Sequence, residues 1–184
     1  MTTEDMAVLW TGRFGDDAVI SESFTELTVD VPAALWVEAL TFARDSVHCD
    51  FFDWLTGVDE LTDGFHIVAH VFSLGGRHHL LLRTLIPRDR PVLGTATGVY
   101  RGANWHERET FEMFGVVFEG HPDLKPLLLP DGFEGNPLRK DFVLAARVAK
   151  AWPGAKEPGE GGGGAPSRRK NLPPGVPTGW GPHA

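Results

Sequence analysis

The 184-residue sequence predicts an α+β fold, in which a mixed or antiparallel sheet packs against two helices and an extended, irregular C-terminal arm follows. Three observations predict this class. Apolar and polar residues alternate over 27–31, the pattern of a half-buried strand. Apolar residues then recur at helical spacing over 32–45. Two runs rich in β-forming residues within 65–86 flank a Gly-Gly pair, which favours a hairpin.

The first elements follow in chain order. Residues 7–30 predict short strands, the clearest being FTELTVD. Asp30 is a plausible helix cap, and Pro32 suits the first turn of the helix expected over 32–45. The apolar face of that helix comprises Leu35, Trp36, Ala39, Leu40 and Ala43.

A hairpin is expected between the runs 65–74 and 77–86, because a two-residue turn at Gly75-Gly76 tolerates positive φ. This turn sets the register, with Phe72 opposite His79 and Val71 opposite Leu80. The core face then carries Ile67, Ala69, Val71, Leu80 and Leu82, and the other face carries His66, His70 and His79.

A second helix is expected from about Thr95 to Phe114, with Gly115 as its C-terminal stop and a short strand over 116–118. The segment after Gly120 is rich in proline and glycine yet carries many leucines and phenylalanines. That apolar content indicates packing, against the domain or against a partner.

The composition divides the chain into three parts. We expect a globular domain over 1–119, an irregular partner-docking segment over 120–150, and a Gly/Pro-rich basic tail over 151–184. The tail holds 9 of the 22 glycines and 7 of the 14 prolines, which propagate helices and strands poorly. Such a composition is typical of a segment that orders on another protein.

The charge and cysteine content exclude several classes of function. A net charge of −8 disfavours general nucleic-acid binding, which needs basic surface. The single cysteine, Cys49, excludes a disulfide framework and a four-thiolate iron–sulfur cluster held by this chain alone. We expect no transmembrane helix and no signal peptide, and hence a protein kept in the cytoplasm.

The candidate chemical groups are individually weak. His66 and His70 lie about 13 Å apart along a strand, and His70 with His79 provides at most two metal ligands. Glu109 and Glu112 share a helix face that permits acid–base chemistry. A surface ion pair between Arg108 and Glu112 is the plainer expectation there, and Cys49 is expected to be a buried structural residue.

Residues 104–142 carry a recognisable signature. The matching positions are Trp105, Glu107, Arg108, Glu109, Phe111, Glu112, Phe114, Gly115, Gly120, His121, Pro122, Asp123, Leu124, Pro137, Leu138, Arg139, Lys140, Asp141 and Phe142. In this order and spacing they resemble the signature of the C subunit of proton-translocating NADH–quinone oxidoreductase, respiratory complex I. The upstream LTGVDE and GANW are compatible with the family, and the tail resembles its actinobacterial members.

Four positions depart from the family pattern. Glu112 stands where Asp is usual, Lys125 where Arg is usual, and Asn136 where His is usual, while Phe133 replaces a common Trp. The first two keep the charge, so docking should survive. The missing histidine puts a side-chain role at position 136 in doubt.

The resemblance implies a non-catalytic scaffold subunit of the peripheral arm, bound to the complex's D subunit near the quinone site. It implies no cofactor in this chain, with FMN, iron–sulfur clusters, NADH and quinone on other subunits. It implies a peripheral location on the cytoplasmic side of the cell membrane, reached only through the complex. We expect the signature residues to serve docking, with Gly115 and Gly120 allowing turns and Arg139, Lys140 and Asp141 making charge-assisted contacts to the partner.

Three other interpretations stay open. The chain could be the equivalent subunit of a membrane-bound hydrogenase or another quinone-reducing complex. It could be a free-standing hydrolase using His121 with Glu107 or Glu109, or an independent binding module. A hydrolase would turn over substrate alone, whereas a scaffold would not.

Overall fold

The computed structural model describes residues 1–24 and 26–143, and residues 1–144 form one compact unit. The fold is α+β, as the sequence predicts. Its main sheet has five strands in the order β1 (Val19–Ser23), β2 (Glu26–Asp30), β5 (His79–Ile86), β4 (Phe65–Phe72) and β3 (Phe51–Asp59). Because β2 and β5 pair in parallel and the other neighbours pair antiparallel, the sheet is mixed.

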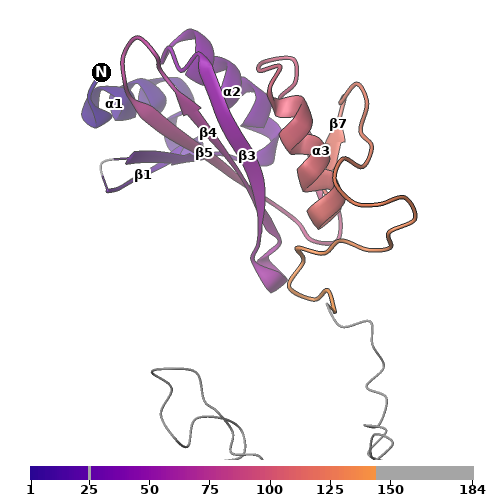
Figure 1. Cartoon of the computed structure of the whole chain (residues 1–184). Helices are drawn as coiled ribbons and strands as arrows, with labels where there is room; N and C mark the ends of the chain where they lie inside the picture. The colour runs from indigo at the N-terminus through magenta and orange to yellow at the C-terminus, as the bar shows by residue number, and fades with distance from the viewer. Residues whose placement is uncertain (25, 144–184) are drawn as a thin grey trace, which may run out of the picture. The chain divides into compact units, whose positions relative to one another are not determined.

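Three α-helices accompany the sheet in the described residues: α1 (Thr3–Phe14), α2 (Trp36–Asp45) and α3 (Ala103–Phe114) (Figure 1). The buried side chains of α1 and α2 share one apolar core with the alternate residues Val29, Ile67 and Leu82 of the sheet. A second, two-stranded sheet pairs β6 (Val92–Gly94) in parallel with β7 (Val117–Glu119). This small sheet lies beside α3, and its two strands are the ones that precede and follow that helix in the chain.

The expected strands over 7–30 are wrong at their start, because residues 3–14 form α1. Thr2 and Asp5 make a reciprocal capping box at its N-terminus, which satisfies two free backbone N–H groups. Met6, Trp10 and Phe14 recur every four residues and are buried. These two signals, the T-x-x-D cap and the four-residue spacing, indicate the helix in retrospect.

The predicted hairpin has the expected register, with Phe72 opposite His79 and Val71 opposite Leu80. Its turn is different. Ser73 and His78 close a four-residue loop, and the positive φ of 53° belongs to Arg77 rather than to the glycines. The Ser73 hydroxyl accepts a hydrogen bond from the Gly76 N–H, which holds this wider loop.

The two predicted helices begin later than expected. A 3₁₀ turn, Ala33–Leu35, precedes α2, and Asp30 provides no cap because its carboxylate accepts hydrogen bonds from Arg83. The helix expected from Thr95 starts only at Ala103. Thr95 instead continues from β6, its N–H donating to the carbonyl of Glu119. Gly115 ends α3 in the left-handed region at φ 74°, as predicted.

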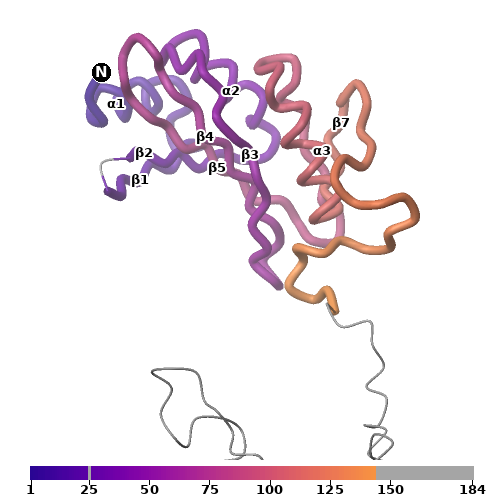
Figure 2. The backbone as a smooth tube through the Cα atoms, in the orientation of Figure 1, coloured from indigo at the N-terminus to yellow at the C-terminus, as the bar shows by residue number. Residues whose placement is uncertain are grey.

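The segment after Gly120 has no helix or strand as far as the structure describes it, to residue 143. In Figure 2 its orange trace loops out beside α3 and returns to the end of β3. Its described residues belong to the same compact unit as residues 1–119. The expected tail, 151–184, lies outside the described residues.

Candidate functional site

The signature residues gather on α3 and on the segment 120–143 that covers it. Helix α3 carries Trp105, Glu107, Arg108, Glu109 and Phe114, and the covering segment carries Gly120, His121, Pro122, Leu138, Arg139, Lys140 and Asp141. Gly115 ends the helix, and β7 leads from it to residue 120. The site therefore consists of α3, its Gly115 cap and residues 120–143, which we call the covering segment.

Glu107 is fully buried and ties α3 to the end of β6. Its carboxylate accepts hydrogen bonds of 2.5 Å from the Ala96 N–H and the Thr95 hydroxyl. Burial raises its pKa to about 7, and the two hydrogen bonds oppose that rise only in part. The carboxyl group of Glu107 therefore titrates near neutral pH inside the protein.

His121 lies against this carboxylate, with its Nε2 3.9 Å from an oxygen of Glu107. Its Nδ1 accepts from the Asp123 N–H at 3.0 Å, so in the neutral ring Nε2 carries the proton. Nε2 lies 3.3 Å from the Asn104 carbonyl oxygen. Both side chains have no exposed surface, so a substrate has no direct access to this pair.

Arg108 and Glu112 hold the covering segment by its backbone. The Arg108 guanidinium donates to the carbonyls of Lys125 and Pro126, at 3.0 and 2.9 Å. The Glu112 carboxylate accepts from the N–H groups of Leu128 and Leu129, both at 2.8 Å. Burial would raise the pKa of Glu112, but these N–H groups outweigh it and hold the pKa below its ordinary value.

This arrangement replaces the expected ion pair between Arg108 and Glu112, which is wrong. A segment without helix or strand must find other partners for its backbone polar groups. One helix side chain supplies donors to its carbonyls, and another, one turn later, supplies acceptors to its amides. Both side chains bind the backbone of the covering segment and form no direct ion pair with each other, although the Arg108 charge helps to lower the pKa of Glu112.

The C-terminal carbonyls of α3 are capped by the chain that follows. The last four carbonyls of a helix have no partner within it. Here each one accepts a hydrogen bond, in the order Phe111 from the Gly115 N–H, Glu112 from the Asn136 side chain, Met113 from the Leu138 N–H and Phe114 from Arg139 Nε. Asn136 thus has a capping role, although its departure from the family pattern had put a side-chain role there in doubt. The Arg139 cation also suits the negative end of the helix.

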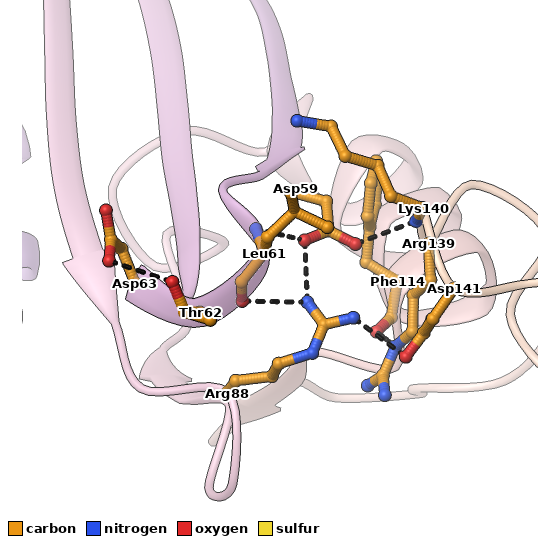
Figure 3. Close-up of polar contacts among 9 residues, drawn as sticks. All are labelled: Asp59, Leu61, Thr62, Asp63, Arg88, Phe114, Arg139, Lys140 and Asp141. Carbon is orange, nitrogen blue, oxygen red and sulfur yellow. Dashed lines mark hydrogen bonds and ion pairs between the residues drawn. The ribbon is translucent and has the colours of Figure 1, made fainter.

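The end of the covering segment is hydrogen-bonded to Asp59, the last residue of β3, and to Arg88, as Figure 3 shows. Asp59, almost fully buried, accepts from Arg88 at 2.6 Å, from the Leu61 N–H and from the Lys140 N–H. Arg88 also donates to Asp141 at 2.9 Å. Burial would raise the pKa of Asp59, but these hydrogen bonds hold it below its ordinary value.

Two guanidinium groups stack on one buried ring at this point. The Arg88 and Arg139 guanidinium carbons lie 4.9 and 5.0 Å from the centroid of the Phe65 ring. Phe65 in turn contacts Phe114 edge-on, with 6.2 Å between ring centroids. The cluster thus joins β3, β4, α3 and the covering segment in one place.

A second group of signature side chains makes no such contacts to the described part of the chain. Trp105 is 65% exposed and Leu138 is 54% exposed. Pro122 and Lys140 are exposed residues, and the Lys140 side chain makes no hydrogen bond or ion pair with the described residues although its backbone N–H binds Asp59. Glu109, half-buried, likewise has no hydrogen bond or ion pair within residues 1–24 and 26–143. These five are the signature positions available for docking, whereas Arg139 and Asp141 are used within the chain.

A hollow of about 380 Å³ opens between the C-terminal turn of α3 and the covering segment. Its walls include Phe111, Leu129 and Phe133. Leu128, 60% exposed, and Phe133, 42% exposed, belong to the same stretch of chain. The covering segment therefore exposes apolar side chains beside this hollow, next to charged ones such as Asp131 and Glu134.

The other candidate groups, His70, His79 and Cys49, lie outside α3 and the covering segment. His70 lies between Asp53, at 2.9 Å, and His79, at 3.1 Å, on the face of the sheet away from the core. Cys49 is buried, and burial raises its pKa to about 12, as expected of a structural thiol.

Within the described residues, no group of three or more His, Cys, Asp or Glu is placed to hold a metal ion. Across the same residues, no helix is long and apolar enough to cross a membrane.

Sequence reasoning missed Asp59 and Arg88 as parts of the site. Asp59 was visible only as the fifth residue of LTGVDE, and Arg88 as one of several charges in a turn. Asp59 and Arg88 are 29 residues apart, and no repeating pattern in the sequence links two residues at that separation. Only the fold brings these two side chains to the returning covering segment.

Comparison with known proteins agrees with this geometry. The family model for the respiratory-chain NADH dehydrogenase 30 kDa subunit matches residues 29–148. The C subunit of the NADH-quinone oxidoreductase of Caulobacter vibrioides is 43% identical over 132 residues, covering 70% of this chain and 66% of that protein. The corresponding protein of Bordetella petrii is 37% identical over 155 residues, covering 73% and 74%.

Two solved structures have the same fold. A trypsin-resistant fragment of Nqo5 is 27% identical, with a TM-score of 0.59 over 67% of this chain and all of that one. A chain of the membrane-bound sulfane sulfur reductase, an archaeal respiratory membrane complex, is 26% identical, with a TM-score of 0.70 over 78% and 86%. The match to the family model spans more than half of the chain and includes its signature helix, so this chain belongs to the family of the respiratory-chain NADH dehydrogenase 30 kDa subunit.

Proposed function

We propose that this chain is a non-catalytic scaffold subunit in the peripheral arm of an NADH–quinone oxidoreductase. In this role it binds the D subunit near the quinone site and supports electron transfer from NADH to quinone, coupled to proton translocation. It carries no cofactor, because FMN and the iron–sulfur clusters belong to other subunits. It meets the membrane only through the complex, on the cytoplasmic side.

One observation carries the scaffold role. The signature splits into side chains that hold the covering segment on α3 and side chains that face outward with no partner among the described residues. Arg108, Glu112 and Arg139 belong to the first set, and Trp105 and Leu138 to the second. A surface built in this way supports docking, since hydrogen bonds from α3 fix the backbone of the covering segment and leave apolar side chains outside for a partner.

The free-standing hydrolase is the weaker alternative. It requires His121 and Glu107 to reach a substrate, yet both side chains have no exposed surface. Glu109 is on a different face of α3 from Glu107, because two positions along a helix are rotated by about 200°. The geometry therefore supports neither version of that acid–base pair.

The experiment is recovery of the tagged full chain from the membranes of its own host. We expect the other peripheral-arm subunits to co-purify, the D subunit among them, together with NADH-dependent quinone reduction. The chain purified alone should show no turnover and less than stoichiometric iron. Recovery without any redox subunit would overturn the proposal.

A related membrane-bound complex is the second candidate, favoured by the TM-score of 0.70 with a chain of the archaeal sulfane sulfur reductase. The equivalent subunit of a membrane-bound hydrogenase or another quinone reductase belongs to the same class. The same purification separates these cases, because the subunits recovered with the chain and the electron donor accepted by the assembly differ between them.

A further inference from the structure

The outward face of α3 presents an indole and a carboxylate one turn apart. Trp105 lies in the first turn and is 65% exposed, an unusual state for so large an apolar side chain. Glu109 follows four residues later, so both side chains project from the same face, with about 5–6 Å between their β-carbons. We call these two residues the outward pair.

Glu109 differs from the other two glutamates of α3. Glu107 and Glu112 each accept two hydrogen bonds, from Thr95 and Ala96 and from Leu128 and Leu129. Among residues 1–24 and 26–143, Glu109 has no donor and no ion pair, although it is only half exposed. Its negative charge is therefore available to a cation brought from outside.

The nearby basic side chains among the described residues form no ion pair with Glu109. His106, three residues earlier, packs edge-on against Phe52, with 5.6 Å between the ring centroids. The Arg108 guanidinium is used by the carbonyls of Lys125 and Pro126, and the Lys125 ammonium is paired with Asp123 at 2.7 Å. Arg101 is exposed in the turn before α3, two helical turns from Glu109, and makes no ion pair with the described residues. The described part of the chain thus offers this carboxylate no partner of its own.

We propose that the outward pair receives an arginine side chain of a partner protein in the same complex. A guanidinium can lie flat on the indole of Trp105 and direct two N–H groups to the carboxylate of Glu109. Arginine fits better than lysine, because only the planar group stacks and donates in a fork at once. Tryptophan and arginine are also among the residue types that dominate binding energy at protein interfaces, and here they would contact each other.

This inference rests on the proposed function, since it assumes that the chain has partner subunits. The test measures the amount of partner subunits recovered per tagged full chain from native membranes. Trp105→Phe keeps an aromatic ring and Trp105→Leu keeps only apolar bulk, while Glu109→Gln removes the charge at nearly constant shape. Leu74→Ala, at a 59% exposed position in the β4–β5 loop, and Arg101→Gln, in the turn before α3, are the matched controls.

We expect Trp105→Leu and Glu109→Gln each to reduce recovery at least about tenfold, the effect of losing a principal interface contact. Trp105→Phe should retain most of the recovery, and both controls should stay within about twofold of the unchanged chain. Added salt should weaken recovery of the unchanged chain more than that of Glu109→Gln, because the variant has lost the ion pair.

The other outcomes each overturn one part of the proposal. If the unchanged chain recovers no partner at all, the proposed function fails. If it recovers partners and both Trp105→Leu and Glu109→Gln do so equally well, the outward pair is not an interface. If Trp105→Phe loses as much as Trp105→Leu, or if the recovered assembly contains only copies of this chain, the arginine of a partner protein is the wrong occupant. Thermal unfolding of each isolated variant should match that of the unchanged chain, which separates lost binding from lost folding.

Discussion

The five-stranded sheet and the covering segment are held in place by different forces. In the sheet and its helices α1 and α2, large apolar side chains such as Trp10, Trp36 and Leu82 are fully buried. Among the described residues of the covering segment no apolar side chain is fully buried, and Leu128 and Leu138 are 60% and 54% exposed. Hydrogen bonds from α3 and from Asp59 at the end of β3 hold its backbone.

This difference means that the stability of the domain and the position of the covering segment depend on different contacts. Burial of apolar surface is non-directional and stabilises the whole domain. Hydrogen bonds add little net stability each, but they fix geometry and are costly to leave unmade in buried places. We therefore expect changes in the sheet to alter global unfolding, and changes at the covering segment to alter local opening and docking.

The largest effect should come from the sheet. Leu82 is fully buried in the central strand β5, and Leu82→Ala should lower the free energy of unfolding by about 2–5 kcal/mol. Chemical denaturation of the isolated chain measures it. Leu85→Ala, on the same strand but 45% exposed, should cost less than about 1 kcal/mol. Equal losses at the two positions would show that burial in the sheet is not what stabilises the domain.

The second effect concerns Glu107, whose pKa of about 7 lies above its ordinary value of 4.5. The folded chain holds the Glu107 proton more tightly than the unfolded chain does. The contribution of this proton to the free energy of unfolding is therefore complete below about pH 4.5. It is lost as the pH rises through about 7, and it amounts to up to about 3 kcal/mol. His121 and the donors Thr95 and Ala96 are the groups that face the carboxylate.

Glu107→Gln replaces the protonated carboxyl with a neutral group of nearly the same shape. The variant and the unchanged chain should unfold at similar denaturant concentrations at about pH 5. At about pH 8 the variant should be the more stable of the two, by about 2–3 kcal/mol. Denaturation curves at several pH values measure this, and a difference that does not change with pH would refute the titration of Glu107.

The third comparison uses two carboxylates that bind the same arginine. Asp59 is 3% exposed and has three donors, whereas the Asp141 side chain is 62% exposed and has Arg88 as its one partner among the described residues. Asp59→Asn should cost about 1–3 kcal/mol, because it removes charge-assisted hydrogen bonds in a buried place. Asp141→Asn should cost less than about 1 kcal/mol, as exposed ion pairs do. Thermal unfolding at fixed pH distinguishes the two, and a larger loss at Asp141 would contradict the role given to burial.

The sheet was the more predictable region. Alternation placed Leu27 and Val29 in the core, and the Gly-Gly pair gave the correct register of β4 and β5, which put Ile67 and Leu82 on the core face. These features follow from a two-residue period that a single sequence displays. The turn itself was not predictable, because Ser73 and His78 close it by a backbone hydrogen bond and the Ser73 hydroxyl accepts from the Gly76 N–H, and no sequence period reveals either contact.

The covering segment was recognisable only as a pattern of residue types. Its proline and leucine content indicated packing, but nothing in it showed that Arg108 and Glu112 would bind backbone rather than each other. The start of α3 was misplaced for the same reason, because the buried carboxylate of Glu107 binds Thr95 and Ala96 outside the helix. Contacts between a side chain and a distant backbone depend on the whole fold, so a local pattern cannot supply them.

The smallest effect should be the most local one. Arg108→Ala removes the donors to the carbonyls of Lys125 and Pro126, and should lower the global free energy of unfolding by no more than about 1 kcal/mol. Amide hydrogen exchange should nevertheless accelerate at Leu128 and Leu129, whose N–H groups bind Glu112 in the adjacent stretch, because local opening does not require unfolding of the sheet. Exchange in β4 and β5 should be unchanged, as it should be throughout the chain in the control Arg101→Ala. If Arg108→Ala instead accelerated exchange equally in the sheet and the covering segment, the two regions would be one cooperative unit, and the separation of stability from positioning would be wrong.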